Sequence, residues 1–257
     1  MQGTYELIKI SGEKDGQIVR LSFDTQTRGN VITPKLLEEF HAALDEIVAM
    51  NPRVLIISGT EKSFSRGADI DTIKSMGPAF QAYVASEFKL FDIVDRLPFI
   101  TVAALTGIVI GNAAELALAC DFRIAAESST FTLPEVAIGF VAPAQRITRY
   151  LGIGQVKDFL LNARMWKAAE AHQHGLITKV VGDAEFEAGL QAFAAELADR
   201  PPLALNVTKQ GIATAYGFGP ADYRGEEHWA YATYLTDDVQ EGFAALAEKR
   251  KPVFTGR

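Results

Sequence analysis

The chain has 257 residues, of which 48% are hydrophobic and 22% are charged, so it can bury a substantial core and is not a disordered protein. Its net charge is −7 and its pI is near 5.2, which argues against a nucleic-acid partner because no overall basic field attracts a phosphate backbone. Charged residues interrupt the N-terminal stretch, and no segment has about 20 apolar residues free of charge. We therefore expect a cytoplasmic protein that binds small metabolites and has no membrane partner.

The single cysteine, Cys120, cannot form a disulfide within the chain, and no group of Cys and His has the spacing of a zinc site. Cys120 lies in the apolar run LALAC, and free cysteines are usually buried. We therefore expect Cys120 in the core and no metal site.

Residues 17–23 alternate between apolar and polar side chains, which predicts a half-buried strand. After a turn-rich stretch, Thr33 can cap a helix that has Pro34 in its first turn, and Asn51 and Pro52 should end that helix. Next come a buried strand at 54–57, a loop at 59–67, a helix at 80–94, a strand at 100–105, a helix at 113–119 and a strand at 122–125. This alternation predicts an α/β core with parallel strands and crossover helices.

From about residue 150 onward the pattern is helical, with one candidate strand at 177–181. The chain contains no linker rich in Gly, Ser or Pro and no repeat of fixed period. We expect residues 1–200 to form the core and residues 201–257 to form a helical region that packs on the core or on a neighbouring subunit. The predicted helices are 155–161, 167–174, 186–197, 203–215 and, with breaks, 223–248.

Two glycine-marked loops, FSRGADI at 64–70 and GIVIGNAAELALACD at 107–121, each follow a predicted strand and precede a helix. Helix N-termini present unpaired N–H groups and the positive end of the helix dipole, so a pair of such loops can bind a developing oxyanion. The residues alone also allow a plainer interpretation, in which Gly67 and Gly111 make tight turns and Asp69 caps a helix.

The motifs resemble those of the crotonase (enoyl-CoA hydratase/isomerase) superfamily. FSRGADI is similar to the family's F-x-A-G-A-D-I, and GNAAELALACDFRIA to its G-G-G-x-E-L-A-x-x-C-D-x-R-I-A. FTLPEVAIG, GLITKVV, PPLALNVTK and the ending TDDVQEGFAALAEKRKPVFTGR follow in the family's order, so the resemblance covers nearly the whole chain. It implies a ClpP-like spiral of repeated ββα units and a helical C-terminal region that builds a homotrimer or a dimer of trimers.

The resemblance also implies the reacting groups. Its two oxyanion donors fall on the backbone N–H groups of Ala68 and Asn112, the second of which is usually a glycine. Because the donor at position 112 is a main-chain N–H, having asparagine in place of glycine preserves it. The Asn112 side chain should extend into the acyl pocket. The family's two hydratase glutamates fall on Glu115 and Glu135, one to activate water and one to protonate the α-carbon. Without the resemblance, these two residues are equally explained as a helix N-terminal acid and a surface carboxylate.

One segment departs from the family pattern. After the P-E motif the family commonly continues I-x-P-G-x-G-G-T-Q-R, whereas this chain continues GFVAPAQRI and lacks the glycine pair. The family's loop helps to hold the water by a backbone N–H, which Pro143 cannot supply. The alternatives to hydration are isomerisation, decarboxylation or C–C hydrolysis of a β-dicarbonyl substrate. A related diketone hydrolase depends on histidine, where this chain has Ala113 and Glu135.

We expect coenzyme A to bind as part of the substrate thioester, and we expect no prosthetic group. A weakly catalytic RNA-associated or assembly protein is the remaining alternative, and the acidic charge and the glutamate pair argue against it. We expect the apolar tail residues Trp229, Tyr231, Tyr234, Leu235, Phe243 and Leu246 to serve subunit contacts. The expected coenzyme A contacts are Arg28, Arg66, Ala68, Asp69, Ile70, Lys249 and Arg250.

Overall fold

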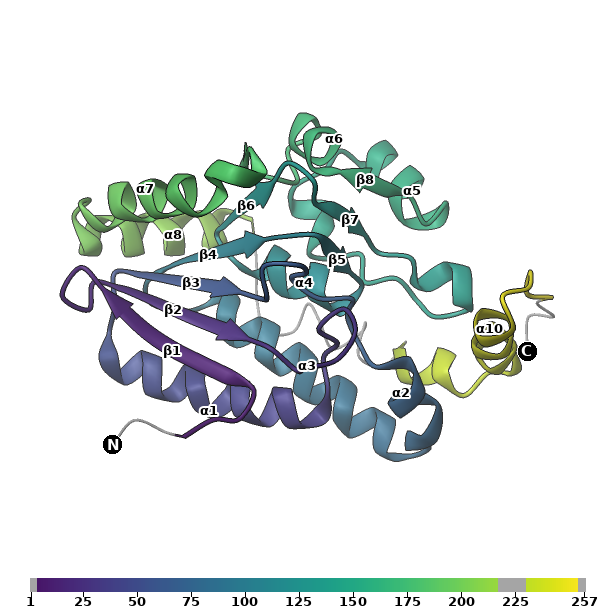
Figure 1. Cartoon of the computed structure of the whole chain (residues 1–257). Coiled ribbons are helices and arrows are strands. Elements are labelled where there is room, and N and C mark those ends of the chain that lie inside the picture. The colour runs from purple at the N-terminus through teal and green to yellow at the C-terminus, as the bar shows by residue number, and fades with distance from the viewer. Residues whose placement is uncertain (1–3, 217–229, 254–257) are drawn as a thin grey trace.

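The structure, a computed structural model, describes residues 4–216 and 230–253. A six-stranded sheet forms its centre (Figure 1), with β1 antiparallel to β2 and every other neighbouring pair parallel. Parallel strands need crossover connections, so this order confirms the predicted α/β core. In spatial order the strands are β1 (Ile8–Glu13), β2 (Ile18–Phe23), β3 (Val54–Ser58), β4 (Ile100–Leu105), β6 (Phe122–Ala126) and β9 (Lys179–Val181).

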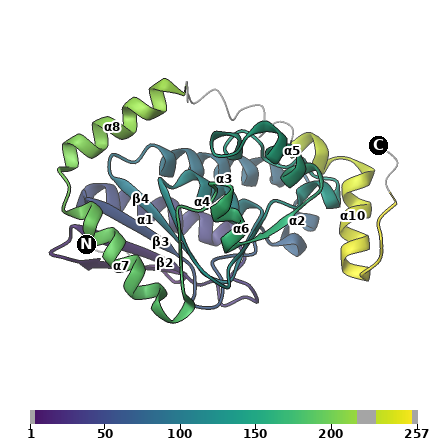
Figure 2. The same ribbon diagram turned by 90° about the horizontal axis from the view of Figure 1, so that it is seen from above.

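Helices cover both faces of this sheet (Figures 1 and 2), with α1 (Pro34–Met50) and α3 (Ala79–Asp95) on one face and α7 (Phe186–Ala198) on the other. Side chains of β3 alternate between the two cores, as the pleat of a strand requires. Leu55 and Ile57 belong to the cluster under α1 and α3, whereas Val54 and Ile56 pack in the cluster that contains α7. A strand buried on both faces explains why residues 54–57 are continuously apolar.

A second, three-stranded sheet is built from short strands, β5 (Ile108–Ile110), β7 (Thr130–Thr132) and β8 (Met165–Lys167). β5 follows β4 and precedes α4 (Asn112–Ala119), while β7 follows β6. Parallel bridges from Ser65 to Val109 and from Ile32 to Ala68 extend the pattern toward the N-terminus. The chain therefore advances as repeated units of a long strand, a short strand and a helix, which is the expected ββα spiral.

Capping residues fix the first long helix as the sequence predicts. The Thr33 hydroxyl accepts a hydrogen bond from the Leu36 N–H at 3.2 Å, and Pro34 occupies the first helical position. Asn51 ends the helix with a left-handed φ of 49°.

The other strands and helices were predicted only in part. Strands β1, β5, β7 and β8 were not predicted, and β8 is a second strand beyond residue 150, where only 177–181 was expected. A helix after the 64–70 loop was expected without bounds, and α2 begins there with Asp69 at its N-cap. The other helices are α2 (Ile70–Met76), α5 (Ile153–Leu161), α6 (Ala168–Gln173), α8 (Pro202–Ala215) and α10 (Asp237–Glu248), with the short 3₁₀ turns η1 (Glu135–Ile138), η2 (Ile147–Arg149) and η3 (Asp183–Glu185).

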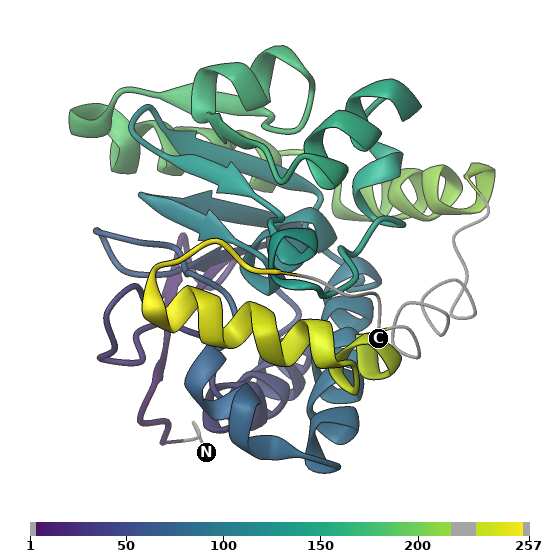
Figure 3. The same ribbon diagram turned by 90° about the vertical axis from the view of Figure 1, so that its right-hand side faces the viewer.

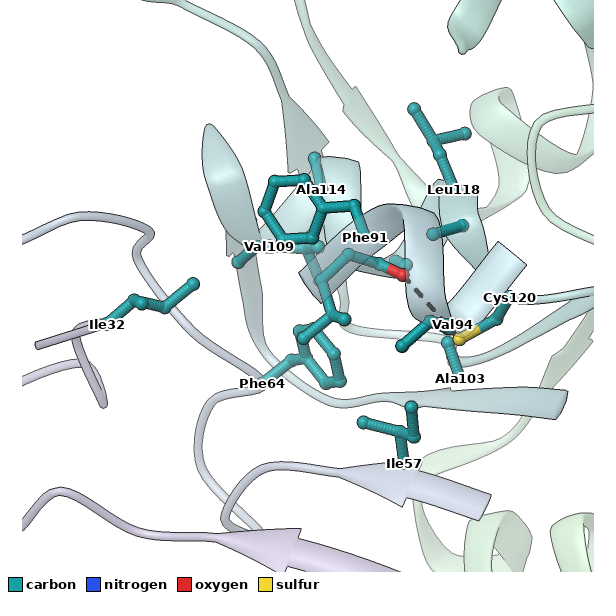
Figure 4. Close-up of a cluster of buried hydrophobic side chains, with 14 of the residues drawn as sticks. Ile32, Ile57, Phe64, Phe91, Val94, Ala103, Val109, Ala114, Leu118 and Cys120 are labelled. Atoms are coloured by element: carbon teal, nitrogen blue, oxygen red, sulfur yellow. Dashed lines mark hydrogen bonds between the residues drawn. The ribbon is translucent and has the colours of Figure 1, made fainter. Parts of the chain in front are cut away.

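Cys120 lies in the main core, as expected, near Val94, Ala103 and Leu118 (Figure 4). Its thiol is 1% exposed and donates to the Leu116 carbonyl oxygen at 3.5 Å. Burial raises the pKa of the Cys120 thiol to about 12, so the side chain behaves as an inert apolar group.

The C-terminal helices leave the sheet in two directions. Helix α8 follows α7 and diverges from it (Figure 2), whereas α10 packs on η1 and α2 at the other end of the molecule (Figures 2 and 3). Gly242 allows α10 to approach closely, since a Cβ there would lie 2.2 Å from the carbonyl oxygen of Ile138. Trp229 and the other residues of the predicted helix before residue 230 lie outside the described residues.

The aromatic tail residues have different surroundings. Tyr234 and Phe243 are buried within their own chain, and the Tyr234 ring stacks on Phe80 with centroids 4.0 Å apart. Leu235 and Leu246 are 63% and 53% exposed, so of the expected contact residues these two remain available on the surface. No helix in the described part of the chain is long and apolar enough to cross a membrane.

Candidate active site

A cavity lies between the 66–68 loop, helices α2 and α3, the start of α4 and the η1 turn. Its wall is mainly apolar, with side chains such as Ile73, Phe80 and Val84. Cavities of this kind bind small ligands, and their few polar groups determine the chemistry. These polar groups come from Arg66, Tyr83, Glu87, Asn112 and Glu135.

The two glycine loops meet at this cavity. Gly67 has a φ of +79°, and a Cβ at this position would lie 2.5 Å from the Ile110 carbonyl oxygen and 3.3 Å from the Asn112 backbone nitrogen. Ala68 and Asn112 both line the cavity. Within residues 4–216 and 230–253, neither of their N–H groups donates a backbone hydrogen bond. The structure thus brings together the two main-chain donors that the motifs indicated.

Asn112 occupies the first position of α4, and the left-handed conformation belongs to Gly111, whose φ is +59°. Asn112 itself is helical, so replacing the family's usual glycine at this position requires no positive φ. The Asn112 amide donates to Oε1 of Glu87 at 2.5 Å. Its side chain lies along the cavity wall, in the region where we expected it to meet the acyl group.

Glu135 begins the η1 turn after Pro134 and lies against the second loop. Its Oε1 is 3.0 Å from the point that a Cβ on Gly111 would occupy, so glycine leaves room for this carboxyl group. Its Oε2 is buried and has no hydrogen-bond partner within the part of the chain that the structure describes. Burial raises the pKa of Glu135 to about 8; its own backbone opposes the rise, and the charges of Glu115 and Glu87 add to it. A carboxyl group with such a pKa is largely protonated at neutral pH.

Glu115 has different surroundings. It lies in the first turn of α4, is 1% exposed, and its Oε2 forms an ion pair with Nη1 of Arg146 at 2.8 Å. The Arg146 guanidinium is fully buried and also lies 3.5 Å from Asp92 and 3.8 Å from Asp95. Glu115 is not among the residues that line the cavity. The structure therefore places the two expected glutamates in one neighbourhood, with only Glu135 at the cavity wall.

The first group of expected coenzyme A contacts surrounds the first loop. Arg66 lines the cavity, and its N–H donates to the Gly29 carbonyl oxygen at 2.9 Å, which places the exposed Arg28 in an adjoining segment. Ile70 begins α2 and lines the cavity, while the Asp69 carboxylate accepts a hydrogen bond from Thr72.

The second group lies at the end of α10. Lys249 ends this helix with a left-handed φ of 54°. Arg250 is paired with Glu241, at 2.5 and 2.8 Å, and with Glu248. Hydrogen bonds from Arg250 hold the pKa of Glu241 at about 2. Neither basic residue lines the cavity of its own chain.

The motifs did not identify Arg146 and Glu87 as site residues. Arg146 lies in the quoted segment GFVAPAQRI, but its partner Glu115 is 31 positions away in sequence. Glu87 lies on the buried face of α3, where apolar residues recur at helical spacing. An acidic residue among these apolar positions was the one sequence signal that could have identified Glu87 as a site residue. Among the described residues, no group of three or more His, Cys, Asp or Glu could hold a metal ion.

Among the described residues, the N–H groups of Ala68 and Asn112 have no backbone partner, and they line one mainly apolar cavity with Glu135, an arrangement that suits enolate-type chemistry. The family model for enoyl-CoA hydratase/isomerase matches residues 13–257. An enoyl-CoA isomerase/hydratase from Mycosarcoma maydis, fer4, is 31% identical over 93% of this chain and 93% of its own length. The crystal structure of an enoyl-CoA hydratase from Bacillus anthracis is 31% identical, covers 98% of this chain and 100% of its own, and has a TM-score of 0.79.

The chain belongs to the enoyl-CoA hydratase/isomerase family of the crotonase superfamily. It is an enzyme of the hydratase/isomerase type, which confirms the interpretation of the motifs. A methylmalonyl-CoA decarboxylase complexed with 2S-carboxypropyl-CoA is 24% identical, covers 99% of this chain and 100% of its own, and has a TM-score of 0.87. At that identity the similarity concerns the fold alone, so it does not favour decarboxylation.

Proposed function

We propose that the protein is an enoyl-CoA hydratase-type lyase that adds water to an α,β-unsaturated acyl-CoA. One observation carries this proposal: the free N–H groups of Ala68 and Asn112 converge on one cavity with the carboxyl group of Glu135. The thioester oxygen would accept from both N–H groups as the enolate forms. Removing one such donor typically costs about 2.7–4 kcal/mol in the transition state.

Glu135 is the proposed proton donor to the α-carbon. Its raised pKa, about 8, keeps a proton on the carboxyl group at neutral pH, and Gly111 places that group beside the Asn112 donor. A group that protonates carbon must hold its proton until negative charge develops there. Glu115 supports this role, because its negative charge adds to the rise in the Glu135 pKa. The further expectation, that Glu115 itself handles the water, is an alternative that Glu115→Gln tests, because Glu115 does not line the cavity.

Isomerisation is the second candidate, and the observation that favours it is the water-binding loop. Pro143 lines the cavity and has no N–H to offer a water. Isomerisation needs the same oxyanion donors and the same α-carbon proton transfer, but it needs no bound water. The two candidates therefore differ only in what happens at the β- and γ-carbons.

Coenzyme A is the proposed carrier, with no separate prosthetic group. Arg66 at the cavity and Arg28 beside it are positioned to contact its phosphates, and arginine suits phosphate by bidentate hydrogen bonding. In this proposal Lys249 and Arg250 contact the coenzyme A that is bound to a neighbouring subunit. Arg250 must then release Glu241 in order to bind a phosphate.

The proposed assembly is a homotrimer or a dimer of trimers. Helix α8 supports it, since its apolar side chains have little cover within the chain and exposed fractions from 56% to 75%. So many exposed apolar side chains are unusual for a helix that contacts only solvent, and they favour a subunit interface. These side chains are Leu203, Val207 and Ile212. The division into a core of residues 1–200 and a helical region of residues 201–257 belongs to the same proposal.

The experiment that tests the function uses purified protein and a panel of enoyl-, dienoyl- and β-carboxyacyl-CoA thioesters, with products identified by mass. Hydration adds 18 mass units, isomerisation leaves the mass unchanged, and decarboxylation removes 44. We expect a gain of 18 units with crotonyl-CoA. A mass loss of 44 from a β-carboxyacyl thioester, with no change in any enoyl thioester, would refute the hydratase assignment.

A further inference from the structure

Glu87 is a buried acidic residue that the proposed mechanism has not yet used. It lies on the inner face of α3, is 2% exposed, and lines the same cavity as Glu135. Apart from the Tyr83 hydroxyl, the rest of that helix face is apolar. Burying a carboxyl group among apolar side chains costs free energy, and perturbed acids in cavities concentrate at functional sites.

The position of Glu87 relative to the oxyanion donors is defined by two contacts. Glu135 lies against Gly111, the residue before the Asn112 donor. Glu87 accepts a hydrogen bond from the Asn112 side chain at 2.5 Å. The two carboxyl groups thus flank Asn112, which the proposed function places on the thioester oxygen. Both carboxyl groups therefore lie near the point at which the proposed thioester oxygen would bind, and the charge of Glu87 adds to the rise in the pKa of Glu135.

We propose that Glu87 is the general base of this site and acts opposite Glu135, which is the general acid. This inference rests on the proposed function. Glu87 takes a proton from water while the water oxygen bonds to the β-carbon, and the C=C electrons move toward the thioester to give the enolate held by Ala68 and Asn112. Glu135 then delivers its proton to the α-carbon, and the carbonyl re-forms. A proton passing from Glu87 to Glu135 through water restores the starting state, so the net change is the addition of one water.

The surroundings of Glu87 suit a base. Burial raises the pKa of its carboxyl group to about 7, opposed by hydrogen bonds from Tyr83 and Asn112, whereas that of Glu135 is about 8. Burial and the Glu87 charge raise the pKa of Tyr83 well above its usual value, so Tyr83 stays neutral. Among the described residues that line the cavity, Arg66 is the remaining charged group. Because the charge of Glu87 is one cause of the raised pKa of Glu135, an ionised Glu87 favours a protonated Glu135.

The test compares the pH dependence of crotonyl-CoA hydration in three variants with that of wild type: Glu87→Gln, Glu115→Gln and Glu135→Gln. The exposed Glu170→Gln on α6 is the matched control for loss of a carboxylate. Gln at position 87 keeps the side-chain shape and an oxygen that can accept from Asn112. A required base makes activity rise as the pH increases through about 7, and a required acid makes it fall above about 8.

We expect Glu87→Gln to lower kcat by about 10²–10⁴-fold and to abolish the acid limb of the profile. Glu115→Gln should retain that limb, and Glu135→Gln should lose the alkaline limb. A Glu87→Gln enzyme that keeps the wild-type acid limb would overturn the inference while leaving the proposed function intact, provided that Glu135→Gln is impaired. Full activity in Glu135→Gln would overturn the proposed function instead. A wild-type protein that neither hydrates crotonyl-CoA nor exchanges its protons with D₂O would contradict both.

Discussion

Replacing Arg146 with Met should destabilise the protein strongly, because it leaves Glu115 as a buried charge without its cation. Arg146 is fully buried and Glu115 is 1% exposed, so water cannot take the place of the guanidinium. Removing one partner of a buried ion pair typically costs about 3–5 kcal/mol. Asp92 and Asp95 are partly exposed and can recover hydration, so most of the loss should come from Glu115.

The measurement is equilibrium urea unfolding at neutral pH, followed by circular dichroism. Arg164→Met is the control, since Arg164 forms an exposed pair with Asp158 that is worth at most about 1 kcal/mol. Adding Glu115→Gln to Arg146→Met should recover much of the stability, because the buried charge is then gone. A loss below about 1 kcal/mol in Arg146→Met would refute this account of the pair.

Three other changes test separate parts of the structure. Gly242→Ala should lower kcat more than it changes KM, because a Cβ 2.2 Å from the Ile138 carbonyl oxygen must displace the turn that carries Glu135; unchanged kinetics would contradict that coupling. Arg66→Glu should weaken coenzyme A binding measured by calorimetry, and wild-type affinity should fall as salt rises; an unchanged Kd would show that the contact is assigned wrongly. Val207→Asp on α8 should dissociate the proposed trimer in sedimentation experiments, and a wild-type protein that is monomeric at micromolar concentration would exclude that assembly.

Long elements with strong local features could be predicted from the sequence. Helix α1 has a capping Thr33, a Pro34 in its first turn and a continuous apolar stripe. Strand β3 is apolar up to its last residue, Ser58, and β4 is apolar except for Thr101. Strands β5, β7 and β8 have three residues each, which is too short for any period to be recognised. Their pairing is decided by tertiary contacts, so the second sheet was implied by the family resemblance and not by local pattern.

The candidate site likewise contains residues that the sequence motifs identify and residues that they do not. Ala68, Asn112 and Glu135 were found because contiguous motifs contain them, and the structure gathers all three at one cavity. The ion pair that holds Glu115 joins residues 31 positions apart, and Glu87 comes from a helix with no motif. Such partners are brought together by packing, which local sequence patterns do not specify.

The central claim is that Glu135 exchanges a proton with the α-carbon of an enolate held by Ala68 and Asn112. The most direct measurement uses butyryl-CoA, which cannot add water, and follows deuterium uptake at its α-carbon in D₂O by mass spectrometry. We expect wild type to catalyse this exchange and Glu135→Gln to be slower by about 10²–10⁴-fold. Exchange at the wild-type rate in Glu135→Gln would contradict the mechanism, whatever product the enzyme forms from an enoyl thioester.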